Sequence, residues 1–175
     1  NDLINHFNVQ KLGNAQISGD MLGDAYEYLM RNFATQSGKS KGQFYTPAEV
    51  SRILAKVVGI DSTVTQDMTV YDPTCGSGSL LLKAADEAPN GITIYGQEND
   101  NATWALSRMN MILHGIESPN IIHKNTLEDN IQEIQNKDKV DVILANPPFG
   151  GKEKANIQEN FPIKTGETAY LFLQH

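Results

Sequence analysis

The chain has 175 residues, of which 39% are hydrophobic, and it carries a formal net charge of −7 at pH 7. This length suits one domain with a buried core. No apolar run approaches the roughly 18 residues that span a bilayer, and the N-terminal NDLINHFNVQ lacks the basic start and apolar centre of a signal peptide. We therefore expect a cytoplasmic protein with no membrane partner.

Cysteine, histidine and charge narrow the class of protein further. Cys75 is the single cysteine, which excludes an internal disulfide framework and a cysteine-cluster zinc site. The four histidines show no metal-ligand spacing, so no metal site is expected. A protein that holds DNA alone usually has a basic face. The negative charge therefore predicts that the positive charge needed to bind any nucleic acid is confined to a local patch or is supplied by another subunit.

Residues 1–41 are expected to form a small helical lead. Residues 1–19 are polar and weakly patterned, whereas a helix capped by Asp20 should run to about Thr35. Apolar residues recur along it at helical spacing and should face the main body: Leu22, Ala25, Tyr26, Leu29 and Phe33.

Residues 42–175 are expected to form the main domain, which opens with a helix. Thr46-Pro47-Ala48-Glu49 is a capping box with proline at the first helical position, and Gly59 ends the helix. Taken alone, these residues indicate no more than a good helix start. The predicted buried face consists of Val50, Ile53, Leu54 and Val57.

A strand, a glycine loop and a helix follow. Residues 69–72 are expected to form a strand ending at Asp72, the loop PTCGSGS covers 73–79, and a helix starts near Leu80. Glycines allow a ligand to approach the backbone closely, and free N–H groups at the helix start attract electronegative atoms. The loop lacks the third glycine of the dinucleotide fingerprint and a Walker lysine, which disfavours a nicotinamide enzyme or a nucleotide triphosphatase.

The next two strands also end in polar residues. Residues 92–97 should form a strand that ends at Glu98, about 26 residues after Asp72, close to the spacing of a ribose-binding acid. A helix capped by Asn101 or a neighbour should end at Gly115, and a short strand at 120–123 leads to Asn125. The apolar side predicted for that helix consists of Ala102, Leu106, Met109 and Leu113, and Trp104 is assigned to packing.

A fourth strand ends in a rigid, acceptor-rich corner. After a short helix and loops over 128–139, residues 142–145 should form a buried strand that stops at Asn146-Pro147-Pro148-Phe149. The prolines lack N–H groups, so the Asn146 side-chain oxygen and the Asn146 and Pro147 carbonyls are free to accept. Phe149 adds a flat apolar face. Such a corner suits a planar group with an –NH2, although a simple strand end terminated by prolines is an equal reading of these residues alone.

Together these elements predict an α/β fold: a doubly wound, mainly parallel, Rossmann-like sheet that is truncated after the fourth strand, followed by a final helix opening near Thr165. Because the carboxyl ends of parallel strands meet at one edge, one cleft is expected to collect the residues at the four strand ends, which are Asp72, Glu98, Asn125 and Asn146.

The motifs resemble a known family. DPTCGSG, the strand ending in Glu98, NPPF and the upstream GQFYTP are similar to the S-adenosylmethionine-dependent amino-methyltransferases of DNA, in particular the adenine-specific group. More narrowly, NPPFGGKE, GETAYLFLQH and AYEYLMRNFA resemble the modification (M) subunit of type I restriction-modification systems. The resemblance covers roughly residues 20–175. It implies a methyltransferase fold for the sheet.

The resemblance also implies roles for individual residues. Tyr45, Thr46 and Pro47 would contact the methionine end of S-adenosylmethionine, and Asp72 with the loop Cys75, Gly76, Ser77 and Gly78 would hold its amino-acid portion. Glu98 would bind both ribose hydroxyls. Asn125 stands where relatives often have aspartate beside the cofactor adenine, and its amide oxygen can still accept from the adenine amino group.

The implied reaction is methyl transfer to N6 of adenine in double-stranded DNA. Asn146, Pro147, Pro148 and Phe149 would form the catalytic corner, with Phe149 stacked on a base flipped out of the duplex. A specificity (S) subunit and a restriction (R) subunit are the implied partners. Two alternatives stay open: an amino-group methyltransferase acting on ribosomal RNA or on protein glutamine, and a fragment that binds cofactor or partners without turnover. Cys75 lies in the cofactor loop with no Pro-Cys pair, so it is not the nucleophile of a cytosine methylase.

Overall fold

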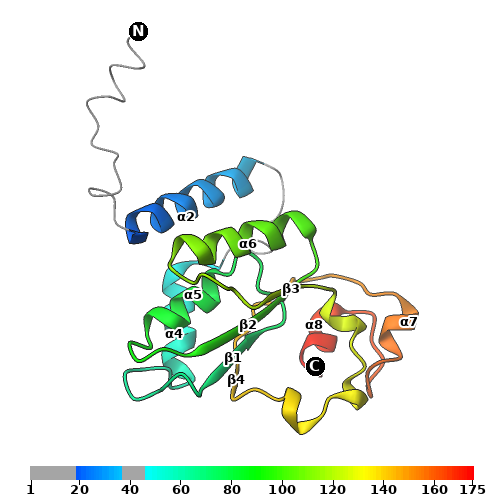
Figure 1. The fold of residues 1–175 in the computed structure, drawn as a ribbon. Coiled ribbons are helices and arrows are strands. Elements are labelled where there is room, and N and C mark those ends of the chain that lie inside the picture. Colours follow the sequence, from blue (N-terminus) through cyan, green and yellow to red (C-terminus); the bar gives the residue numbers. More distant parts are fainter. Residues whose placement is uncertain (1–18, 37–45) are drawn as a thin grey trace, which may run out of the picture.

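The computed structural model describes residues 19–36 and 46–175, and it contains one four-stranded parallel sheet (Figure 1). The strands are β1 (Thr69–Asp72), β2 (Thr93–Glu98), β3 (Ile121–His123) and β4 (Val142–Ile143), in the order β3-β2-β1-β4. All three pairings are parallel. The predicted α/β class and the parallel arrangement are confirmed. The last strand is shorter than predicted, because only Val142 and Ile143 pair with β1.

Four helices lie on one side of the sheet (Figure 1). They are α2 (Gly19–Gln36), α4 (Ala48–Val57), α5 (Ser79–Asp86) and α6 (Asn101–Leu113). α5 and α6 contact the strands directly, whereas α4 packs on α5 and α2 packs on α6. The main core lies between these layers and includes Val70, Leu81, Ile94 and Met111. Trp104 packs against this core and donates its indole N–H to the Ile121 carbonyl at 2.9 Å, which confirms its assignment to packing.

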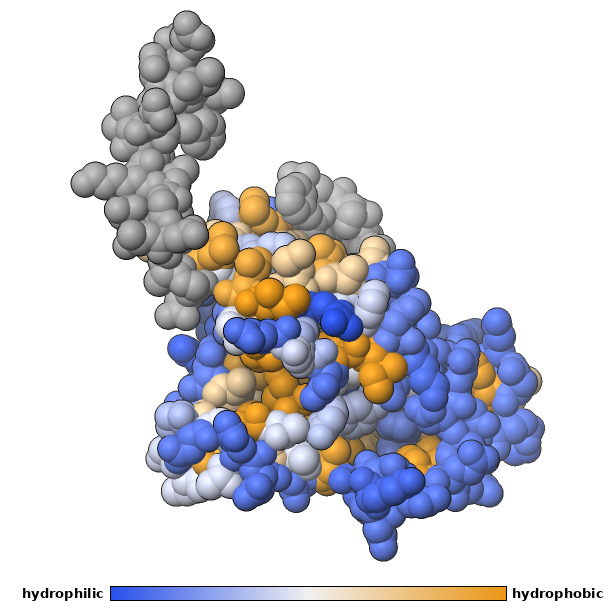
Figure 2. All heavy atoms as spheres, in the orientation of Figure 1, coloured by the Kyte–Doolittle hydropathy of each residue, from blue (hydrophilic) through white to orange (hydrophobic). Residues whose placement is uncertain are grey.

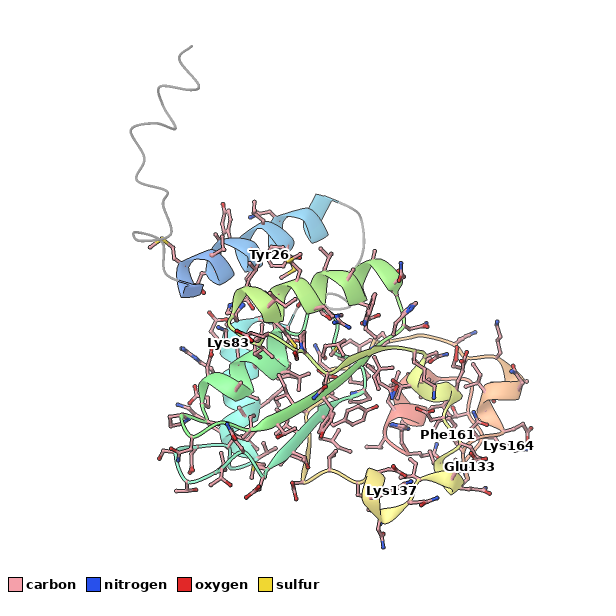
Figure 3. All side chains as sticks on the ribbon, in the orientation of Figure 1. Tyr26, Lys83, Glu133, Lys137, Phe161 and Lys164 are labelled. Atoms are coloured by element: carbon pink, nitrogen blue, oxygen red, sulfur yellow. The ribbon has the colours of Figure 1, made fainter. Side chains whose placement is uncertain are left out.

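The segments after β3 lie apart from these four helices (Figure 1). They comprise the 3-10 turns η1 (Thr126–Glu128), η2 (Ile131–Glu133) and η3 (Asn136–Asp138), and the short helices α7 (Ala155–Gln158) and α8 (Thr168–Phe172). The predicted final helix therefore starts three residues later than Thr165. A second apolar cluster holds these segments together and consists of Leu127, Ile157, Phe161 and Leu171. Phe161 is marked in Figure 3 among these segments.

The predicted buried faces of α2 and α6 are wrong for most of their residues, although Tyr26 and Leu113 are half-buried, and the side chain of Phe33 lies outside the described part of the structure. In α2 the structure buries Gly23, Glu27 and Met30, and in α6 it buries Thr103, Ser107, Asn110 and Met111. The reason is that the two helices pack on each other through small and polar residues: a Cβ added at Gly23 would lie 2.6 Å from the His114 ring. The Tyr26 hydroxyl also donates to the Leu106 carbonyl at 3.3 Å (Figure 3).

Several apolar side chains of these helices are left on the surface. They include Leu22, Leu29, Leu106 and Met109. Figure 2 shows apolar surface over α2 and α6 on this face of the molecule. Among the helices in the described part of the chain, none combines the length and apolarity that crossing a bilayer requires.

The start of α4 also differs from the prediction. Pro47 is the N-cap rather than the first helical residue, and no side chain caps the helix, so no capping box forms. Its buried residues are Ser51 and Ala55, whereas Val57 is 78% exposed and Val50 and Ile53 are also exposed. Small residues face α5 because the two helices approach closely, which leaves the larger apolar residues outside. Leu54 alone of the predicted face packs against the core.

Candidate functional site

A cleft of about 370 Å³ lies at the carboxyl ends of the strands. Three of the four predicted strand-end residues line it, namely Glu98 at the end of β2, Asn125 after β3 and Asn146 after β4. Pro148 lines it as well. The predicted convergence at one edge of the sheet is confirmed for these residues because the strands are parallel and adjacent.

Asp72 is the exception among the strand-end residues. Its side chain is only 2% exposed and lies beneath the cleft rather than in its wall. One carboxylate oxygen accepts from the backbone N–H of Thr74 at 2.8 Å and from the Thr74 hydroxyl at 3.3 Å. Burial raises the pKa of Asp72 to about 7, against the lowering effect of these hydrogen bonds. The carboxylate therefore shapes the start of the glycine loop instead of facing a ligand directly.

The glycine loop turns on two residues with left-handed backbone. Gly76 has φ 54° and Gly78 has φ 79°, and Gly78 is the N-cap of α5. A Cβ at Gly78 would lie 3.0 Å from the Met111 methyl carbon, so the loop packs closely on α6. The N–H of Cys75 donates to the Gln97 carbonyl at 2.9 Å, which ties the loop to β2. Glycine is required here both by conformation and by space.

The side chains of Cys75 and Ser77 are not part of the cleft lining. Both are buried, and burial raises the pKa of the Cys75 thiol well above its usual value. The Ser77 and Ser79 hydroxyls lie 2.9 Å apart, and the Ser79 hydroxyl donates to a Glu27 carboxylate oxygen at 3.1 Å. None of the four loop residues lines the cleft, and the N–H groups of Cys75, Gly76 and Gly78 donate within the protein. The serine side chains anchor the loop to α2. Sequence analysis missed the role of Glu27, which only stood out as an acid within an apolar helix.

Glu98 connects β2 to the glycine loop. One of its carboxylate oxygens accepts from the backbone N–H of Asp100 at 2.7 Å, and the other accepts from the N–H of Gly76 at 3.1 Å. Burial raises the pKa of Glu98, and these hydrogen bonds to the charged form oppose that increase. The carboxylate is thus held at a defined place in the wall of the cleft.

Asn125 occupies the edge of the cleft at β3. Its side-chain oxygen accepts from the N–H of Leu127 at 3.1 Å and caps η1, whereas its amide nitrogen donates to a Glu153 carboxylate oxygen at 3.4 Å. Glu153, Thr168 and Phe172 also line the cleft. Sequence analysis did not identify these three residues as part of the site. The only available signal was their place in NPPFGGKE and GETAYLFLQH.

The acceptor corner is oriented by a residue from far upstream. The amide nitrogen of Asn146 donates to the hydroxyl oxygen of Thr46 at 3.3 Å, immediately before α4. The Leu144 N–H donates to the Tyr71 carbonyl at 2.9 Å and fixes the end of β4 to β1. The nitrogen is committed to Thr46, and no donor to the side-chain oxygen occurs among the described residues, so this oxygen can serve as an acceptor at the cleft.

Four further predicted site residues are not part of the cleft lining, namely Thr46, Pro47, Pro147 and Phe149. Phe149 is 77% exposed and does not line the cleft. The Pro47 carbonyl accepts from the N–H of Ser51 at 3.0 Å and so belongs to the start of α4. Tyr45 lies outside the described residues.

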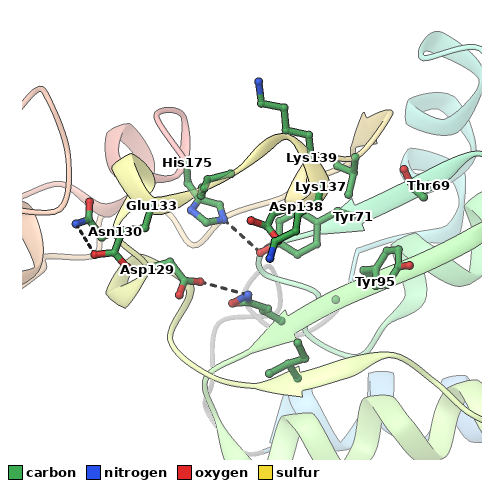
Figure 4. Close-up of a pocket in the computed structure, with 15 residues that line it drawn as sticks. Thr69, Tyr71, Tyr95, Asp129, Asn130, Glu133, Lys137, Asp138, Lys139 and His175 are labelled. Atoms are coloured by element: carbon green, nitrogen blue, oxygen red, sulfur yellow. Dashed lines mark hydrogen bonds between the residues drawn. The ribbon is translucent and has the colours of Figure 1, made fainter.

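A second cavity, of about 580 Å³, lies against the face of the sheet opposite the helices (Figure 4). Tyr71 and Tyr95 of the sheet line one side, and residues of the segment 129–140 line the other. The His175 ring nitrogen lies 3.3 Å from the Tyr71 hydroxyl in this cavity. It contains none of the strand-end residues Glu98, Asn125 and Asn146, so the candidate site is the smaller cleft.

The sheet order and the strand-end cleft define an α/β protein with a methyltransferase fold. The fold matches that of a protein from Listeria monocytogenes described as a class I S-adenosylmethionine-dependent methyltransferase, with a TM-score of 0.74, 15% identity, and coverage of 93% of this chain and 50% of the other. The model of the N-6 DNA Methylase family matches residues 17–175. The chain belongs to this family.

Two relatives within the family are more similar in sequence. The type I restriction enzyme MpnII methylase subunit of Mycoplasma pneumoniae is 38% identical over 165 residues, which cover 85% of this chain and 30% of that protein. The structure of the type I restriction-modification methyltransferase subunit of Streptococcus thermophilus has a TM-score of 0.78 at 37% identity, over 94% of this chain and 37% of the other. The chain spans about a third of the length of the curated relatives it matches.

Proposed function

We propose that this chain carries the catalytic site of a DNA adenine N6-methyltransferase, the modification subunit of a type I restriction-modification system. One observation carries the proposal: the Asn146 corner, oriented by Thr46, opens on the same cleft as Glu98 and Asn125. An acceptor site for an amino group and a site with the residues of a nucleoside pocket thus share one cavity. Family membership and the type I methylase relatives support the same reading.

The cleft suits S-adenosylmethionine as cofactor. Its volume of about 370 Å³ lies within the usual range of roughly 300–1,000 Å³ for small-molecule sites. Gly76 and Gly78, both with left-handed backbone, add no side chain of their own to the loop. Glu98 would accept from both ribose hydroxyls, and the backbone of Cys75–Gly78 would hold the amino-acid portion. Thr46, Pro47 and Tyr45 would face its methionine end. Asp72 would act through the loop that it supports.

The chemistry of the corner follows from its acceptors. S-adenosylmethionine supplies an electrophilic methyl group bound to a sulfonium. The Asn146 side-chain oxygen and the Pro147 carbonyl would accept the two hydrogens of an adenine amino group, which favours a localised lone pair on its nitrogen. Proton loss becomes easy once that nitrogen is methylated and positive, so no strong base is needed at the start. Placement and electrostatics supply the rate.

The target base and the partners follow from the surface. A base inside a duplex cannot reach the cleft, so the target adenine would be flipped out and stacked on the exposed Phe149. With a net charge of −7, the chain requires a second source of positive charge for DNA binding. A specificity subunit would supply it, and a restriction subunit would complete the assembly.

Transfer of a tritiated methyl group tests the proposal. The protein is incubated with its specificity subunit, S-adenosylmethionine and unmethylated DNA, and label is expected in N6-methyladenine. Asn146→Ala should lower transfer by at least about 100-fold, while the exposed Asn156→Ala in α7 serves as a matched control and should leave it unchanged.

Each alternative function predicts a different result in the same assay. Label that appears in ribosomal RNA or in a protein glutamine, and not in DNA, would show that the substrate is that RNA or protein instead of DNA. Cofactor binding without transfer to any of the three acceptors would identify a binding module. Wild-type transfer by Asn146→Ala would overturn the proposed role of the corner.

A further inference from the structure

Glu153 is a cleft residue to which the proposed chemistry gives no role. It is partly buried and lines the cleft together with Asn125, whose amide nitrogen donates to the Glu153 carboxylate at 3.4 Å. Among the described residues, no ion pair involves Glu153. A carboxylate has about four lone-pair sites, so Glu153 keeps acceptor capacity that faces the cleft.

The backbone around Glu153 is held in place on two sides. Its N–H donates to the Gly166 carbonyl at 2.9 Å, and its carbonyl accepts from the Gln158 side chain at 3.0 Å. Lys152 forms an antiparallel bridge with Glu167. The segment after the acceptor corner is therefore fixed across the cleft, and it delivers the carboxylate of Glu153 to the β3 side.

Sheet order determines which ligand group this carboxylate would meet. In the order β3-β2-β1-β4, Asn125 at β3 lies on the far side of Glu98 at β2 from Asn146 at β4. If Glu98 binds a ribose, the group beyond it toward β3 is the nucleobase attached to that ribose. The target base, in contrast, belongs at β4. Glu153 and Asn125 therefore face the adenine of the cofactor.

The polar atoms of the pair complement an adenine edge. Adenine presents a donor at its 6-amino group beside an acceptor at N1. The Asn125 oxygen already accepts from the Leu127 N–H, so the group that Asn125 turns to the cleft is its NH2, a donor. Glu153 supplies an acceptor beside it. A charged acceptor also forms a stronger hydrogen bond than a neutral amide oxygen.

We propose that Glu153 and Asn125 together recognise the adenine of the cofactor, with the Glu153 carboxylate accepting from the 6-amino group and the Asn125 amide donating to N1. This inference rests on the proposed function, because it takes an adenosyl group to be the ligand. It assigns the acceptor role to Glu153 in place of the Asn125 oxygen expected from the sequence.

The test compares two ligands that differ at this edge. Isothermal titration calorimetry measures binding of S-adenosylhomocysteine and of S-inosylhomocysteine, in which a carbonyl replaces the amino group and N1 carries a hydrogen. The wild-type protein is expected to prefer the adenosyl ligand by roughly a hundredfold, because the inosyl ligand reverses both the donor and the acceptor.

Variants of the pair separate its contribution from that of the rest of the cleft. Glu153→Ala should weaken the binding of S-adenosylhomocysteine about tenfold. In Glu153→Gln the side-chain NH2 can donate to the carbonyl of the inosyl ligand. The preference for the adenosyl over the inosyl ligand should therefore fall to about tenfold or less. Glu159→Gln, an exposed carboxylate paired with Lys164 (labelled in Figure 3), is the matched control and should match the wild type.

The outcomes distinguish this inference from the proposed function. Thermal unfolding of each variant without ligand confirms that it is folded, and the near-isosteric Glu153→Gln provides the result if Glu153→Ala is not. Wild-type binding and preference in both Glu153 variants would overturn the inference and leave the proposed function intact. Equal binding of the two ligands by the wild type would also overturn it. A protein that does not bind S-adenosylhomocysteine would overturn the proposed function and this inference together.

Discussion

The side-chain amide nitrogen of Asn146 lies 3.3 Å from the hydroxyl oxygen of Thr46, one hundred residues earlier in the chain. The contact joins the loop before α4 to the corner after β4. It commits the nitrogen of the amide and leaves its oxygen as the acceptor, so Thr46 is a positioning residue for Asn146 in addition to its proposed contact with the cofactor.

Replacing the Thr46 hydroxyl tests this relationship. Thr46→Val keeps the shape but removes the acceptor, so Asn146 is no longer held in one orientation. Single-turnover methyl transfer is expected to slow about tenfold. Thr46→Ser keeps the hydroxyl and should retain most of the rate, a rescue that a merely structural role does not predict. Thr63→Val on the exposed surface is the control. A Thr46→Val protein as fast as the wild type would contradict the role.

Phe149 and Phe161 form a matched pair for separating function from stability. Phe149 is 77% exposed, whereas Phe161 is 2% exposed in the second apolar cluster. Phe149→Ala should change the free energy of unfolding by no more than about 0.5 kcal/mol, yet weaken DNA binding by about tenfold because a stacking face is lost. Phe161→Ala should instead destabilise the fold by about 3–5 kcal/mol. Urea unfolding and DNA titration measure both effects. Unchanged DNA binding in Phe149→Ala would remove it from the site.

Asp72 makes the stability of the cofactor-free protein depend on pH. Burial raises the pKa of this carboxyl to about 7, above its ordinary value of 3.8, and burial also raises the pKa of Glu98. The folded state therefore binds more protons than the unfolded state between about pH 4 and pH 7. The stabilising effect of neutral Asp72 is fully present below about pH 4 and is lost as the pH rises through about 7.

Asp72→Asn removes this dependence because an amide does not ionise, while its oxygen can still accept from Thr74. Its thermal midpoint should exceed that of the wild type at pH 8, and the difference should disappear at pH 4. Thermal unfolding without cofactor from pH 4 to pH 8 measures this. Asp67→Asn, at an exposed position, should run parallel to the wild type throughout. Parallel curves for Asp72→Asn as well would contradict the prediction.

Gly96 of β2 allows the glycine loop to sit directly on the sheet. A Cβ at this position would lie 2.7 Å from the Ile121 side chain and 3.0 Å from the Cys75 sulfur. Gly96→Ala is therefore expected to destabilise the protein by about 1–3 kcal/mol and to weaken S-adenosylhomocysteine binding by displacing the loop. At Gly166 the nearest such contact is 3.7 Å, so Gly166→Ala should be close to neutral. Urea unfolding with an unchanged slope is the measurement.

Local patterns in the chain predicted the strands of the sheet and the positions where strands and helices end. β1 has the predicted bounds, Thr69–Asp72, and β2 and β3 each begin one residue later than predicted. Gly59 and Gly115 follow helix ends with φ of 84° and 85°. These features depend on short apolar runs and on the backbone preferences of glycine and proline, which act within a few residues. For the same reason the strand-end positions of Glu98, Asn125 and Asn146 were predictable.

Packing between segments that are distant in sequence determined the features that the local patterns did not predict. The buried sides of α2 and α6 depend on the close approach of Gly23 and His114. The helical spacing of apolar residues gives no sign of that contact. The burial of Asp72 depends on the loop that closes over it, and the cleft wall of Glu153, Thr168 and Phe172 depends on a segment folding back to β3. The chain alone therefore indicates which chemistry each strand end carries. The folded structure decides which of those groups meet a ligand, because that depends on contacts between residues far apart in sequence, such as Thr46 and Asn146.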